Sequence, residues 1–167
     1  RANPYDDMSI RMFNGIESVY QDFTQVIRLN KDFGDIIKSW SHGHKSALHK
    51  AQKLGLVVKK ADYHNEWQEF YKVYNATVKR WGDNAQTIYS WDTLKYLKQR
   101  KNSNVCLWLA LYKDEVIAGI FTLSAKENVS AWLAACYEDR YILRPYHILI
   151  YEIILDAYKG GCNWFDF

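Results

Sequence analysis

Cysteine is scarce in this sequence, and its three cysteines lie far apart. Cys106, Cys136 and Cys162 form no C-x-x-C pair. An odd number of widely spaced thiols argues against a disulfide framework and gives no spacing typical of a zinc site. We therefore expect buried, free thiols in a reducing compartment.

The sequence also lacks a long apolar run and a recognisable leader. No apolar stretch approaches the roughly 20 residues of a transmembrane helix. The first residues, RANPYDDMSIRMF, contain no signal-peptide core and do not begin with Met. We expect a piece of a longer protein in which residues 1–23 form a poorly defined segment. We place it in the cytoplasm, with association at the inner surface of the membrane as an alternative.

A strong charge imbalance is absent as well. The formal net charge is +3 and the sequence pI is about 8.6, which alone does not indicate nucleic-acid binding. The 167 residues are 49% hydrophobic and 16% aromatic. This composition predicts one folded domain with a substantial core.

Hydrophobic periodicity predicts mainly helices in the first hundred residues. Segment 32–40 has apolar residues at the i, i+3, i+4 and i+7 positions of an amphipathic helix. Ser41 is a suitable N-cap for the next helix, and Asn65 with Gln68 resembles a capping box. We expect strands at 24–29 and 56–59, and helices at 32–40, 41–54, 65–81 and 90–100.

The second half of the sequence predicts three strands of a sheet, followed by a helix and one more strand. Apolar segments 105–112, 116–124 and 129–136 are joined by short polar turns, which is typical of an antiparallel meander. Pro145 suits a helix start and Gly160 its end, before a strand at 162–167. The fold class is α+β (mixed α/β), with a largely antiparallel sheet flanked by helices. The polar loop 137–144 and the following helix start are the expected ligand site.

Four segments carry a resemblance to a known family. They are WSHGHKSALHKAQKLGLVV at 40–58, FYKVYNATVKRWG at 70–82, LALYKDEVIAGI at 109–120, and the RP…FDF ending at 144–167. Their order resembles the GNAT acyltransferase fold. Their residue motifs are similar to those of the Fem family of aminoacyltransferases, which build peptidoglycan cross-bridges. They are also similar to motifs of related domains in cell-envelope biosynthesis.

The resemblance implies an acyltransferase that joins an aminoacyl or acyl group to an amine without a covalent enzyme intermediate. Fem proteins have two GNAT-like halves, and the chain resembles the second half, incomplete at its C-terminus. Loop 137–140 has no glycine and carries two acids, unlike the pyrophosphate loop of CoA-dependent relatives. We therefore favour aminoacyl-tRNA over acyl-CoA as donor, and a cell-wall precursor or sugar-linked amine as acceptor.

Three carboxylates are candidates for catalysis. Glu138 or Asp139 can accept a proton from the attacking amine; the alternative is a solvated loop in which either acid pairs with Arg140. Asp166 lies between two phenylalanines, so its pKa can be raised enough for a base. Its alternative is a position on the solvent face of the last strand.

The candidates for substrate binding fall into two groups. Around the predicted helix start, a cation or hydrogen-bonding ring can hold a phosphate or carboxylate. A basic helix can bind a diphosphate or a tRNA backbone, or be simply a solvated face. The residues are Arg140, Arg144, Tyr146 and His147 in the first group, and Lys45, His49 and Lys53 in the second.

Two other function classes remain open. An acyl-CoA-dependent N-acetyltransferase would bind CoA saturably, and a non-catalytic binding or scaffold domain would tolerate loss of the candidate carboxylates. A metal enzyme is not expected, because the histidines lack the spacing and carboxylate neighbours of a known site. The acceptor, the group transferred and the oligomeric state are left open.

Overall fold

The computed structural model describes residues 24–85, 87–99 and 104–167, so the predicted N-terminal segment 1–23 lies outside the described residues. The elements, in chain order, are β1 (Val26–Arg28), α2 (Phe33–Lys38), α3 (His42–Lys53), β2 (Val57–Lys60), α4 (His64–Trp81), η1 (Gly82–Asn84), α5 (Trp91–Gln99), β3 (Val105–Tyr112), β4 (Glu115–Ala125), β5 (Asn128–Cys136), η2 (Glu138–Leu143), α6 (Pro145–Lys159) and β6 (Trp164–Asp166). None of these helices is long and apolar enough to cross a membrane.

The described strands form one six-stranded sheet in the order β1-β6-β5-β4-β3-β2. Strands β2 to β5 are antiparallel neighbours, and β1 is antiparallel to β6. Strand β6 is parallel to β5, and α6 makes the crossover between them. The predicted α+β class, the meander and the largely antiparallel sheet are confirmed.

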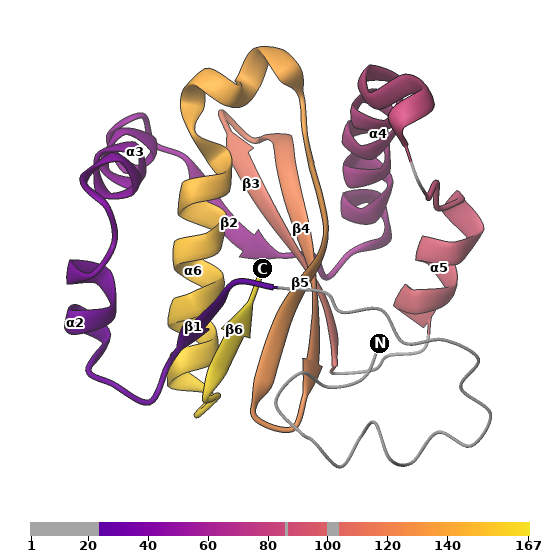
Figure 1. The fold of residues 1–167 in the computed structure, drawn as a ribbon. Coiled ribbons are helices and arrows are strands. Elements are labelled where there is room, and N and C mark those ends of the chain that lie inside the picture. The colour runs from indigo at the N-terminus through magenta and orange to yellow at the C-terminus, as the bar shows by residue number, and fades with distance from the viewer. Residues whose placement is uncertain (1–23, 86, 100–103) are drawn as a thin grey trace.

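Helices cover both faces of the sheet (Figure 1). Helices α4 and α5 lie on one face, and α6, with α2 and α3 outside it, lies on the other. Phe70 and Tyr74 of α4 are fully buried against Phe121 of β4. On the opposite face, Leu149 and Ile153 of α6 pack into the second core. Helix α4 therefore packs on β4 and β5 from one face, and α6 packs on β3 and β4 from the other.

The start of α4 differs from the prediction. No capping box forms between Asn65 and Gln68; the helix begins at His64 instead. The Glu66 carboxylate accepts hydrogen bonds from the amides of Asp62 at 2.8 Å and Tyr63 at 2.9 Å. Glu66, at the third helical position, thus reaches back to the amide of the N-cap residue Tyr63 and to the amide before it. The predicted start of α6 at Pro145 is confirmed.

Candidate active site

Strand β5 loses its neighbour halfway along its length. Strand β6 pairs with β5 at Asn128, Val129 and Ser130, and no described strand lies on that edge from 131 to 136. The register between β4 and β5 shifts beside Phe121, leaving Trp132 as an extra residue. Such a bulge bends a strand. The edge of β5 from 131 to 136 is without a strand partner among the described residues, and we call this unpaired edge the β5 gap.

The backbone of Ala134 faces this gap. The amide of Tyr137 donates to Ile117 of β4 at 3.1 Å. Peptide groups alternate in direction along an antiparallel strand, so those of Ala134 and Cys136 point away from β4. At Cys136 the hydroxyl of Thr77 lies 3.2 Å from the amide nitrogen and 3.1 Å from the carbonyl oxygen. Among the described residues, no hydrogen bond engages the N–H or the carbonyl of Ala134 on this side of β5.

The start of α6 lies at the same end of the sheet. Arg144 takes a left-handed conformation (φ 64°) as the N-cap, which turns the chain sharply from η2 into α6. Pro145 follows at the first helical position. Tyr146 and His147 come next and are half-buried. The positive end of the helix dipole therefore points out beside these side chains.

Tyr146 and His147 line a small aromatic cavity of about 170 Å³, which we call the aromatic niche. Its walls come from the segment between α2 and α3, the start of α3, the first turns of α6 and the residue after β6. The residues are Trp40, His44, Tyr146, His147, Ile150 and Phe167.

Burial shifts the pKa of both polar rings of the niche toward the neutral form. Burial, with Cys136 and Tyr141 nearby, raises the pKa of Tyr146 far above its ordinary value. Burial lowers the pKa of His147, and His44 and Arg144 lower it further. The Nδ1 atom of His147 is buried and has no hydrogen-bond partner among the described residues. A neutral imidazole with a free nitrogen can exchange a hydrogen bond or a proton with a ligand.

The loop candidates lie on η2, outside the niche. Arg140 forms ion pairs with Asp139 at 3.4 Å and with Glu115 at 3.3 Å. The local pair that we gave as an alternative for Asp139 is therefore present. Glu138 is exposed. The roles of Glu138, Asp139 and Arg140 in chemistry or binding stay predictions.

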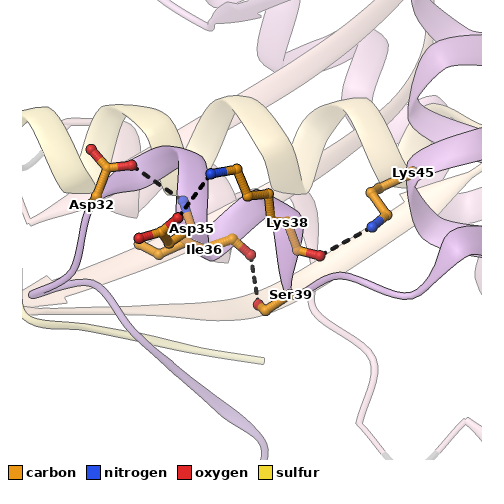
Figure 2. A network of polar contacts seen from close by, with 6 residues as sticks. All are labelled: Asp32, Asp35, Ile36, Lys38, Ser39 and Lys45. Atoms are coloured by element: carbon orange, nitrogen blue, oxygen red, sulfur yellow. Dashed lines mark hydrogen bonds and ion pairs between the residues drawn. The ribbon is translucent and has the colours of Figure 1, made fainter.

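The basic helix α3 presents its candidates away from the start of α6. Lys45 donates from its Nζ atom to the carbonyl of Lys38 at 3.0 Å, closing the end of α2 against α3 (Figure 2). Lys45 and His49 also line an open cavity of about 370 Å³ beside Tyr151. Lys53 is exposed at the last turn. The structure therefore does not gather these three side chains around the β5 gap.

Asp166 lies in β6, opposite Ser130 of β5 and Val26 of β1. It is half-buried, and its carboxylate accepts a hydrogen bond from the hydroxyl of Thr24. The neighbouring Phe167 reaches the aromatic niche. The structure therefore gives Asp166 a local partner, and its role as a base stays a prediction.

Sequence reasoning missed two residues that contact the end of β5. Thr77 and Arg80 of α4 both bond to the backbone of Cys136. A signal was present, because Tyr74, Thr77 and Arg80 are spaced three residues apart and share one helix face. That spacing placed polar groups directly beside a buried aromatic residue.

Comparison with known proteins gives the following matches. The sequence profile of the acetyltransferase (GNAT) domain matches residues 41–167. No curated protein sequence matches the chain. Among solved structures, FemX superposes with a TM-score of 0.73 at 14% identity, over 86% of this chain and 52% of that chain.

Two further solved structures resemble the chain. L-PGS from Bacillus licheniformis gives a TM-score of 0.63 at 10% identity, over 86% of this chain and 43% of that one. A GNAT-family acetyltransferase from Staphylococcus aureus Mu50 gives a TM-score of 0.54 at 12% identity, over 65% of this chain and 70% of that chain. The chain thus spans about half of FemX and less than half of L-PGS. At these sequence identities, the superpositions show similarity of fold alone.

Proposed function

Because the chain belongs to the GNAT acetyltransferase domain family, we propose that it transfers an aminoacyl or acyl group to an amine in cell-envelope biosynthesis. The acceptor is an amine on a peptidoglycan precursor or a surface polysaccharide. The transfer reaction takes place in the cytoplasm or at the inner surface of the membrane. The donor that we favour is aminoacyl-tRNA.

The β5 gap is the observation that carries this proposal. An extended donor arm can lie along the unpaired edge of β5 and bond to the Ala134 peptide group. An N–H there can also stabilise the oxyanion that forms when the carbonyl is attacked. The aromatic niche gives the acceptor amine or the transferred group a partly open place beside the start of α6.

The proposed reaction needs no nucleophilic side chain. The acceptor nitrogen attacks the carbonyl carbon of an ester or thioester, and a C–N bond forms as the C–O or C–S bond breaks. The amine loses one proton to a base, and the leaving oxygen or sulfur takes up one proton. Glu138, Asp139, Asp166 and His147 are the candidate bases. Positioning of the two substrates supplies most of the rate enhancement.

The loop before α6 supports aminoacyl-tRNA as donor. Segment 137–143 contains no glycine, and Glu138 and Asp139 occupy the first turn of η2. Both acids would repel a pyrophosphate held by this loop. The Fem resemblance points to the same donor. Acyl-CoA is the second candidate, because the matching family is described as acetyltransferases and Arg144 stands at the positive end of α6.

Calorimetric titration of the purified chain tests the proposal. The two probes are acetyl-CoA and puromycin, a stable analogue of the aminoacylated 3′ end of tRNA. Saturable binding of puromycin favours aminoacyl transfer, and binding of intact aminoacyl-tRNA should then weaken steeply with salt. Saturable binding of acetyl-CoA alone favours the acetyltransferase. Failure of both probes would refute acyl transfer by this chain.

A further inference from the structure

Two side chains of α4 take the place of a strand at the end of β5. The Thr77 hydroxyl accepts from the Cys136 amide and lies 3.1 Å from both the Cys136 and the Val73 carbonyl oxygens. Arg80 adds a second donor, with Nη1 at 3.3 Å from the Cys136 oxygen. Thr77 and Cys136 are both fully buried. The last peptide groups of β5 are thus satisfied by a helix.

Arg80 also holds the segment that follows β5. Its Nη2 atom donates to the phenol oxygen of Tyr141 in η2 at 2.6 Å, and its guanidinium lies 5.0 Å from the centre of that ring. The Tyr141 ring in turn lies 6.1 Å from the ring of Tyr146 in the niche. One planar group therefore connects α4, β5 and η2 at the mouth of the β5 gap.

The contacts of Arg80 are made to neutral groups. Within the described part of the chain, no carboxylate forms an ion pair with it. Within that part of the chain, its position follows from hydrogen bonds to the Cys136 carbonyl and the Tyr141 hydroxyl. Docking of α4 does not require Arg80, because the side chains of Phe70, Val73 and Tyr74 already anchor that helix and are fully buried in the core beside the sheet. The geometry of the guanidinium, with two donors in one plane, fits the Cys136 carbonyl and the Tyr141 hydroxyl together.

We propose that Thr77 and Arg80 are positioning residues for acyl transfer, which fix the end of β5 and η2 so that the Ala134 edge stays open to the donor. They act through Cys136 and Tyr141 and need not touch the substrate. This inference rests on the proposed function. The new element is that two side chains of α4, Thr77 and Arg80, keep the β5 gap accessible.

The variants separate geometry from charge. Arg80→Ala removes both donors, Arg80→Lys keeps the charge without the planar fork, and Tyr141→Phe removes one hydrogen bond and keeps the ring. Lys79→Ala is the matched control, since Lys79 is an exposed cation one residue away. Thr77→Val, which loses the hydroxyl at nearly constant volume, tests the second residue.

Two measurements decide the proposal. The first is calorimetric binding of whichever probe, puromycin or acetyl-CoA, the unaltered chain binds. We expect Arg80→Ala and Arg80→Lys to weaken it by about 10- to 100-fold, the scale of a small misplacement in an active site. Adding ethylguanidinium should restore binding to Arg80→Ala but not to Thr77→Val. Lys79→Ala should bind as the unaltered chain does.

The second measurement is hydrogen exchange, which does not depend on any ligand. Arg80→Ala should accelerate exchange in residues 134–144 and leave the buried turns of α4 unchanged. Acceleration throughout the chain would assign Arg80 a general role in folding and overturn the proposal. Full probe affinity in Arg80→Ala or Arg80→Lys would overturn it too, with the proposed function intact. Failure of the unaltered chain to bind either probe would instead refute the proposed function, and this inference with it.

Discussion

The imidazole rings of His44 and His147 lie 5.5 Å apart, at an angle of 51°, where the start of α3 meets the start of α6. The two rings cannot both carry a proton without repulsion, and Arg144 adds a further positive charge beside His147. The niche therefore favours a neutral His147. Burial of His147, together with this contact and the charge of Arg144, lowers its pKa and makes the stability of the domain sensitive to pH.

We expect the free energy of unfolding to fall as the pH drops below about 6.5, the pKa of histidine in an unfolded chain. The folded pKa of His147 is lowered by burial, His44 and Arg144, so the unfolded chain binds the proton first. The loss is complete below the folded pKa. Urea unfolding between about pH 7.5 and about pH 5 measures it. His147→Asn should flatten the profile, whereas His49→Asn, at an exposed site, should leave it unchanged.

Gly119→Ala should destabilise the domain by about 1–3 kcal/mol. A Cβ atom at Gly119 would lie 2.5 Å from Cδ2 of the buried Phe70 ring and 2.8 Å from the carbonyl oxygen of Trp108. Neither neighbour has room to move, because both belong to the packed sheet and helix. Urea unfolding measures the change. Gly43→Ala, whose nearest neighbour lies at 3.9 Å within α3, should instead stabilise the chain by up to about 1 kcal/mol.

The thiols should react slowly with iodoacetamide while the chain is folded. Burial raises the pKa of Cys106 to about 11 and that of Cys136 to about 12. At pH 8 the thiolate fraction of Cys106 is then about one in a thousand, and that of Cys136 is smaller still. Mass spectrometry after timed alkylation measures this, and the same chain in urea provides the fast reference. Rapid modification of folded Cys136 would contradict the buried environment of the end of β5.

Local sequence patterns were enough to predict most elements of the fold. The apolar alternation of the strands and the cap residues Ser41 and Pro145 are short-range signals, and the structure follows them. The hydrogen bonds between Thr77 and Cys136 join residues 59 positions apart. Periodicity carries no information about such a partner. The same holds for the aromatic niche, because Trp40 and Phe167, which both line it, lie far apart in the sequence.

Charge posed a different difficulty for the site prediction. A basic helix pattern does not show which lysines are already engaged, and Lys45 donates to the backbone carbonyl of Lys38. The loop acids illustrate the same point, because Asp139 is paired with Arg140. Side-chain partners of exposed charges depend on the fold, so the residue list alone could not separate binding groups from structural ones.

The acids of η2 allow the choice of donor to be tested directly. If Glu138 and Asp139 exclude a pyrophosphate from the start of α6, Glu138→Gln with Asp139→Asn should increase the affinity for acetyl-CoA several-fold. Neutralising Asp139 also releases Arg140 from one of its two carboxylate partners. The gain should shrink as salt is added, since exposed charges are screened within about 10 Å at 0.1 M ionic strength.

A matched control removes the same charge elsewhere. Asp92→Asn with Glu127→Gln changes two exposed acids, one in α5 and one in the turn between β4 and β5, and should leave acetyl-CoA affinity unchanged. The Glu127→Gln side chain keeps an oxygen that can accept the hydrogen bond from Asn163. Calorimetry at low and moderate salt compares the two double variants. Equal affinity in both would mean that the shape of η2, rather than its charge, excludes CoA. A gain confined to the η2 variant would mean that two carboxylates select the donor class in a fold otherwise able to accept acyl-CoA.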